Sequence, residues 1–180
     1  MRKALLLGTM TVAAAGLALT GAPAQATSVT FSLTGGTLSV AQPSSTAALT
    51  GGALSGLAGT ALTGSLGTTT VTDGRGGVTG WTSTIAQTTA FTDGTTVIPA
   101  ANTKAWVASA IVPGGVAVVT PGTYLTQASG LALTSSAQSF VTATAVVGNN
   151  SAAFNPSIAV TIPSNATAGD YTGVITQTVS

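Results

Sequence analysis

Residues 71–85 read VTDGRGGVTGWTSTI and carry the clearest structural signal in the chain. β-Branched residues stand at both ends, and the Gly-rich segment between them begins with Asp73-Gly74, a pair typical of turns. From Trp81 onward the composition is that of a strand, and Trp81 and Ile85 share one face because strand side chains alternate. The stretch therefore predicts two strands joined by a tight turn, with Trp81 and Ile85 facing the core.

The rest of the chain has a similar composition. Gly, Thr and Ser recur throughout, whereas Lys is scarce and Glu is missing, so good surface-helix formers are not available. Segments with strand character lie at residues 28–33, 37–41, 68–72, 81–89, 105–112, 115–120, 139–147, 157–162 and 171–179. Turn formers separate them, including the run at residues 148–150. We therefore expect an all-β fold, a Greek-key-like β-sandwich or barrel of short strands.

Residues 46–70 form a low-complexity tract in which leucines are set among Gly, Ala, Ser and Thr. The leucines indicate partial burial, while the density of glycine specifies strand register only weakly. Two short strands, a long loop over the sandwich and a flap all fit this tract.

Two blocks of the sequence resemble a known family. Residues 71–83 and residues 168–179, AGDYTGVITQTV, are similar to the WxL domain, a cell-wall-binding domain of Gram-positive surface proteins. The family pattern runs V-x-D-x-R-G and G-W-x-L in the first block, and A-G-x-Y-x-G-x-L-T-W-T-L at the chain end. Here Ser83 stands in place of the first leucine, and Gln177 in place of the second tryptophan. The resemblance implies a β-sandwich that associates noncovalently with peptidoglycan or with companion surface proteins, through motifs that are only partly kept.

The first 26 residues have the features of a secretory signal peptide. Arg2 and Lys3 precede an apolar run, and Ala24-Gln25-Ala26 forms a small-x-small cleavage site. We therefore expect export, cleavage before Thr27, and a single WxL-like β-sandwich domain over residues 27–180. No second apolar run of spanning length follows, so no membrane span is expected after cleavage. With the resemblance, this predicts a location outside the cell, on the surface or wall of a Gram-positive-type bacterium.

Charge and chemistry narrow the possible functions. Only 4% of the residues are charged, which offers no basic surface for phosphates and excludes nucleic acid as a partner. The chain has no His, Cys or Glu, so proton transfer and covalent chemistry would depend on three Asp, the Tyr, Lys and Arg side chains, and hydroxyls. No carboxylate cluster suited to a cation is present in the sequence. We therefore expect no enzyme activity, no cofactor and no metal.

Asp73 and Arg75 are candidate site residues with two interpretations. They are close enough in a Gly-rich turn to pair with one another or with backbone groups. As a recognition surface they would make polar contacts with a ligand. As a structural pair they would clamp the turn that leads into the Trp81 strand, which is the interpretation the sequence favours. Trp81 itself is a core anchor on one interpretation and part of the binding motif on the other.

Trp106 and Tyr171 complete the candidate residues. Trp106 alternates with Ala108 and Ala110, opposite the aliphatic face that includes Val107, so we expect its ring to be exposed and suited to stacking on a sugar or a partner. Tyr171 begins the last strand, whose mixed faces are typical of a strand near a sheet edge. Such an edge allows another chain to pair, including a second copy.

These observations support two functions from different classes. The leading hypothesis is a secreted bacterial surface protein that associates noncovalently with the cell wall or with companion surface proteins. The alternative is a structural subunit of an extracellular fibre or sheath, since charge-poor, Gly/Thr-rich β-domains with free edges suit polymerisation. An ice-binding role is disfavoured because the Thr-x-Thr pairs follow no regular period.

Overall fold

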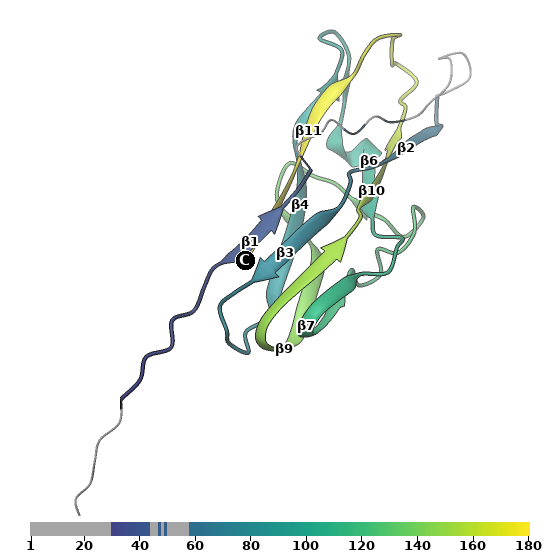
Figure 1. Ribbon diagram of the computed structural model, residues 1–180. Helices are drawn as coiled ribbons and strands as arrows, with labels where there is room; N and C mark the ends of the chain where they lie inside the picture. The colour runs from purple at the N-terminus through teal and green to yellow at the C-terminus, as the bar shows by residue number, and fades with distance from the viewer. Residues whose placement is uncertain (1–29, 44–46, 48, 50–57) are drawn as a thin grey trace, which may run out of the picture. The chain divides into compact units, whose positions relative to one another are not determined.

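The computed structural model describes residues 30–43, 47, 49 and 58–180. It separates into two units, Met1–Leu33 and Thr34–Ser180. In the first unit, the described residues 30–33 form no helix or strand. The second unit is all-β, with a single 3₁₀ turn at Ala100–Asn102 among its described residues. The predicted fold class, an all-β sandwich or barrel, is therefore confirmed (Figure 1).

The larger sheet has seven antiparallel strands. Its main path runs, in spatial order, through β1 (Leu38–Ala41), β3 (Thr69–Asp73), β9 (Gln138–Phe154), β4 (Trp81–Thr92) and β11 (Thr172–Val179). Two further strands join the sheet: β5 (Val97–Ile98) pairs with β4, and β7 (Val112–Thr120) pairs with β9. The long β9 strand is the centre of the sheet, because it pairs with β3, β4 and β7 along different parts of its length.

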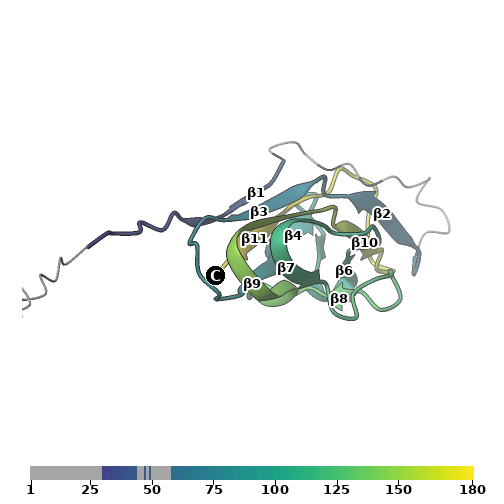
Figure 2. The ribbon, with the colours of Figure 1, turned by 60° about the horizontal axis from the view of Figure 1, so that its bottom comes forward.

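The smaller sheet has four strands in the order β2 (Ala61–Ser65), β10 (Ser157–Thr161), β6 (Thr103–Trp106) and β8 (Leu131–Ala132). Figure 2 shows these strands gathered beside the curved larger sheet. Fully buried side chains from both sheets form one core, including Val71, Ile85, Val141 and Ile158. Burial of such aliphatic side chains is the main favourable contribution to folding in a chain without cysteine.

Several predicted strand boundaries are wrong. Residues 105–112, predicted as one strand, belong to the end of β6, a connection, and the start of β7, so the chain changes sheets there. Residues 148–150, predicted as a turn, lie inside β9, because its ladders with β3 and β7 outweigh local turn preference. Residues 30–33, predicted as part of a strand, form none, and residues 28 and 29 lie outside the described residues.

The low-complexity tract is described only in part. Residues 44–46, 48 and 50–57 lie outside the described residues. The remainder includes β2 and the start of β3, which matches one of the three alternatives left open for this tract, the short strands. β2 pairs with β10 in the smaller sheet, whereas β3 pairs with β1 and β9 in the larger one. The two strands of this tract therefore lie in different sheets.

Ala145 is the one non-glycine residue with positive φ, 50°, in the described part of the chain. It lies in β9 where the register with β7 shifts between Val116 and Val118. A residue with a Cβ atom in the left-handed region is strained by about 1–2 kcal/mol. This position is therefore a bulge that alanine occupies at a cost in stability.

Replacing Ala145 with glycine is expected to raise the free energy of unfolding by about 0.5–1 kcal/mol. The gain from removing the Cβ strain exceeds the entropy that glycine loses on folding. Urea unfolding curves measure the change. Ala143→Gly is the matched control, because Ala143 is buried in the same strand without positive φ, and it should lower stability. Equal losses in both variants would contradict the proposed strain.

Candidate functional site

The candidate residues of the first sequence block meet at the junction of β3, β4 and β9. Asp73 ends β3 and lies opposite Asn150 of β9. The Arg75 guanidinium donates from Nε to Asp73 Oδ1 at 2.8 Å and from Nη2 to Asp73 Oδ2 at 3.0 Å. Asn150 Nδ2 donates to Asp73 Oδ2 at 3.2 Å, and Trp81 Nε1 donates to Asn150 Oδ1 at 2.9 Å. We call these four residues the Asp73 cluster.

The Asp73 cluster fixes the loop that precedes Trp81. The backbone N–H of Arg75 donates to Asp73 Oδ1 at 3.1 Å, and Arg75 Nη2 donates to the carbonyl oxygens of Thr79 and Gly80 at 3.3 Å and 3.1 Å. Asp73 is only 2% exposed, whereas the Arg75 side chain is 33% exposed. These contacts are those of the predicted turn clamp. Asp73 has little surface left with which to contact a ligand.

Trp81 anchors the cluster to the core. Its side chain is 2% exposed and packs in the same buried group as Ile85, so the predicted core facing of both residues is confirmed. Asn150 was missed by the sequence analysis, which assigned it to a turn. A single Asn within a strand gives no local signal, because its importance depends on lying opposite Asp73 and within reach of the indole N–H.

The hydrogen bond from the Arg75 side chain lowers the pKa of Asp73 from 3.8 to about 2, against an opposing effect of burial. A folded-state pKa below the unfolded value means that the ionised carboxylate stabilises the fold above about pH 4. That stabilisation disappears as the pH falls toward 2. Because Arg75 is partly exposed and screened by solvent, the ionised Asp73 contributes about 1 kcal/mol to the free energy of unfolding.

We therefore expect the stability difference between the wild type and Asp73→Asn to shrink as the pH falls from 5 toward 2. Unfolding by urea at several pH values measures this difference. The pKa of Asp93 is also lowered to about 2, first by a hydrogen bond from the Thr96 backbone, but Asp93 is present in both proteins and its effect cancels. A difference that stays constant over this pH range would rule out a stabilising ionised Asp73.

Tyr171 lies near the other end of β4, away from the Asp73 cluster. Its hydroxyl donates to the carbonyl oxygen of Thr167 at 3.0 Å and accepts from the Thr167 backbone N–H at 3.1 Å. The Thr167 hydroxyl donates to Asp93 Oδ2 at 2.8 Å, and Asp93 follows the last residue of β4. Tyr171 therefore helps to join two loops, and it does not share a site with Asp73 or Arg75.

The prediction for Trp106 is half correct. Val107 is fully buried, and Trp106 lies on the opposite side of the strand, as the alternation predicted. The ring is only 8% exposed, however, so the expected exposed aromatic is wrong. The connection between β7 and β8 runs beside this strand, since Val107 N–H donates to the Tyr124 carbonyl oxygen at 2.9 Å. The ring is therefore covered by parts of the chain outside β6, which the alternation within β6 cannot predict.

The two half-kept motifs of the sequence lie side by side. β11 pairs antiparallel with β4, and Val179 lies opposite Ser83. The backbone N–H of Thr82 donates to Ser180 O at 2.8 Å, and the N–H of Ser180 donates to Thr82 O at 3.0 Å. The positions where the family pattern has Leu and Trp are therefore neighbours at one end of this strand pair. Gln177, in the place of the second tryptophan, is 95% buried.

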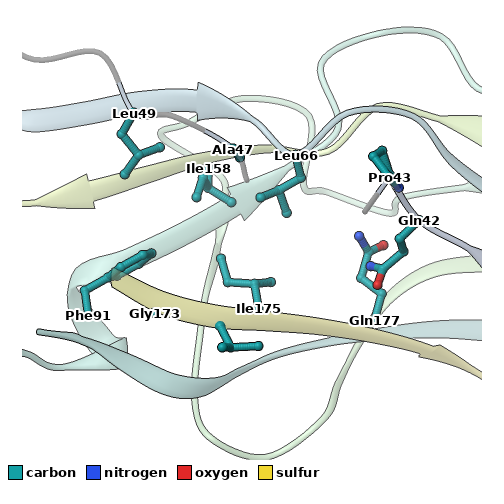
Figure 3. A pocket seen from close by; sticks show the side chains of 11 residues that line it. Gln42, Pro43, Ala47, Leu49, Leu66, Phe91, Ile158, Gly173, Ile175 and Gln177 are labelled. Atoms are coloured by element: carbon teal, nitrogen blue, oxygen red, sulfur yellow. The ribbon is translucent and has the colours of Figure 1, made fainter. Parts of the chain in front are cut away.

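A cavity of about 380 Å³ lies between the sheets beside β11. Its walls are mainly apolar and include Phe91, Ile158 and Ile175. Figure 3 shows the amides of Gln42 and Gln177 at one end of the cavity and Phe91 at the other. Gln177 Nε2 donates to Thr69 Oγ1 at 3.1 Å, while its Oε1 has no partner among the described residues. None of the described residues that line this cavity is charged, so what they offer is packing space and amide groups.

Exposed apolar side chains lie on β7 and on the neighbouring part of β9. Val116 and Val118 of β7 and Val147 of β9 are each more than half exposed, and Val116 lies directly opposite Val147. We call these three residues the valine face. Ala117 and Val119 are partly buried and pack against the core, so the alternation of β7 places Val116 and Val118 outward. Sequence analysis predicted this strand but gave no sign that it was an edge.

Within the described residues no group of three or more His, Cys, Asp or Glu side chains could hold a metal ion. No helix in that part of the chain is both long and apolar enough to cross a membrane. No family model matches the sequence, and searches of curated proteins and of solved structures also find no match. The resemblance to the WxL family therefore stays a prediction.

Proposed function

We propose that this protein is exported, acts without catalysis, and associates noncovalently with the surface of a Gram-positive-type bacterium. Of the two predicted classes of partner, companion surface proteins are better supported than peptidoglycan. The observation that carries this proposal is the valine face, in which Val116 and Val118 of β7 and Val147 of β9 are exposed, on a part of the sheet where β7 carries no charged residue. Exposed apolar surface of this kind is typical of contact with another protein.

The aromatic and charged candidates give less support to sugar binding. Aromatic rings bind sugars by stacking, which requires an open ring face, and the rings of Trp81 and Trp106 are both buried. Asp73 and Arg75 hydrogen-bond to one another and to the backbone, and Tyr171 is bonded to Thr167. These polar groups stabilise the fold, so the exposed valines are the better basis for recognition.

The proposal is tested by retention on three preparations: intact cells of the producing bacterium, the same cells after protease treatment, and purified peptidoglycan. Wild-type protein should be retained on intact cells and lost after protease treatment. Val118→Lys should reduce retention at least tenfold, because a charge opposes burial of the valine face. Val97→Lys is the matched control, since Val97 is exposed to a similar extent but lies on β5.

Peptidoglycan is the competing partner in this experiment. Equal retention of the wild type and Val118→Lys on purified peptidoglycan would assign binding to the wall and to another surface of the domain. Retention on intact cells that survives protease treatment would also contradict a protein partner.

A further inference from the structure

A surface hollow of about 470 Å³ lies beside Lys104 of β6. Residues of β6, of β10 and of the connection between β7 and β8 line it: Lys104, Thr126, Gln127, Ala128, Ala159 and Thr161. All six lie in the described part of the chain. The volume is within the range of about 300–1,000 Å³ that is typical of small-molecule sites. We call this feature the Lys104 hollow.

Lys104 occupies an interior position of the smaller sheet. It lies opposite Ala159 of β10 on one side and opposite Ala132 of β8 on the other. Lysine in a sheet commonly protects an edge strand against pairing with another chain, but β6 lies between two paired strands. The two neighbouring alanines are small and leave open space around the longer lysine side chain. Edge protection therefore does not account for Lys104.

The connection between β7 and β8 forms one wall of the hollow and is held close to β6. The backbone N–H of Thr126 donates to Ser129 Oγ at 3.2 Å, and the N–H of Ser129 donates to Thr126 Oγ1 at 3.2 Å. Gly130 allows the close approach to β6, because a Cβ atom there would lie 3.2 Å from the Ala105 carbonyl oxygen. These contacts give the hollow a fixed wall.

Lys104 has no anionic side chain of its own chain as a partner. All three acidic residues of the sequence lie in the described part of the chain: Asp73, Asp93 and Asp170. The one ion pair among the described residues joins Asp73 to Arg75. The residues outside the described ranges include no Asp or Glu, so their placement does not affect this conclusion. Any counter-ion of Lys104 must therefore come from another molecule.

The other polar groups of the hollow favour a carboxylate. Lys104 Nζ makes one long contact, 3.4 Å to the Ala128 carbonyl oxygen, which leaves further N–H donors available. In the described part of the chain, neither the Gln127 amide nor the Thr161 hydroxyl has a hydrogen-bond partner. One ammonium with neutral donors beside it matches the single charge of a carboxylate. A phosphate group carries nearly two negative charges and would remain incompletely neutralised.

We propose that the Lys104 hollow binds the carboxylate group of a small organic acid or of a peptide terminus. The ammonium of Lys104 neutralises the carboxylate, and the amide of Gln127 and the hydroxyl of Thr161 donate to its oxygens. Ala128 and Ala159 give the adjoining part of the ligand a small apolar contact. This inference goes beyond the proposed function, because the hollow lies on the smaller sheet and the valine face lies on the larger one.

NMR titration of the exported protein with N-acetyl-L-alanine tests the proposal. Saturable shifts are expected at the backbone amides of Lys104, Gln127 and Ala128. The dissociation constant should be on the order of 1 mM, because one charged contact and a few neutral hydrogen bonds supply the affinity. N-acetyl-L-alaninamide, which has no carboxylate, should give no saturable shifts. Added salt should weaken binding of the acid, since the contact is open to solvent.

A dipeptide distinguishes the two sources of the carboxylate. If N-acetyl-L-alanyl-L-alanine binds at least tenfold more tightly than N-acetyl-L-alanine, the hollow is assigned to a peptide terminus. Equal dissociation constants assign it to a small organic acid.

Lys104→Met keeps most of the side-chain length without the charge and should weaken binding of N-acetyl-L-alanine at least tenfold. Thr161→Val should weaken it about threefold, as expected for one neutral hydrogen bond. Thr144→Val is the matched control, because Thr144 is exposed on β9 of the other sheet, and it should bind like the wild type. Urea unfolding shows whether each variant is folded.

A wild type without saturable shifts at these amides would overturn the proposal, as would a folded Lys104→Met protein with wild-type affinity. Equal binding of N-acetyl-L-alanine and its amide by the wild type would also refute it, and this comparison needs no variant. Retention on cells separates the two sites: Lys104→Met should be retained like the wild type if the valine face alone mediates attachment.

Discussion

Replacing Trp81 with alanine is expected to lower the free energy of unfolding by about 3–5 kcal/mol, a large share of the stability of a small domain. The change removes a nearly fully buried ring from the core and also removes the donor to Asn150 Oδ1. The Asn150 side chain also bonds to Asp73, so the loss extends to the residues that fix the turn before β4. Urea unfolding followed by circular dichroism measures the change.

Trp81→Phe separates packing from hydrogen bonding at this position. Phenylalanine keeps most of the apolar ring but has no N–H, so a loss of about 1–3 kcal/mol is expected from the unpaired Asn150 oxygen and the smaller ring. Similar losses in Trp81→Phe and Trp81→Ala would show that the hydrogen bond dominates. A Trp81→Ala protein with near-normal stability but poor retention on cells would place Trp81 in the recognition surface, contrary to its burial.

Replacing Trp106 with alanine is expected to lower the free energy of unfolding by about 3 kcal/mol. The ring lies on the side of β6 opposite Val107 and is nevertheless 8% exposed, so its removal leaves a cavity. Retention on cells, measured on the folded fraction, should be close to that of the wild type, because Trp106 is not part of the valine face.

Val97→Ala is the control for Trp106→Ala, because Val97 is more than half exposed and should change stability by less than about 0.5 kcal/mol. The interpretation from sequence alone gives the opposite result, an unchanged stability and a loss of binding. A Trp106→Ala protein that unfolds at the wild-type urea concentration would therefore restore the exposed-aromatic hypothesis.

The sequence by itself determined the all-β class and the facing of the Trp81 strand. Both follow from local chemistry: the shortage of helix formers, the frequency of β-branched residues, and the alternation that places Trp81 and Ile85 on one side. The pairing of Asp73 with Arg75 was also predictable, since the two residues are two positions apart in a turn. Such features depend on residues close together in the chain.

Only the tertiary structure decided which strands are edges, what covers Trp106, and which partner completes the Asp73 cluster. Asn150 meets Asp73 and Trp81 through the register of β9 with β3 and through a side-chain contact between distant segments. Residues 148–150 have turn propensity but are held in a strand, because β9 forms ladders with neighbours on both sides. The exposure of Val118 likewise depends on which strand lies beside β7. These properties arise from hydrogen bonds and packing between segments far apart in the chain, which local residue preferences do not encode.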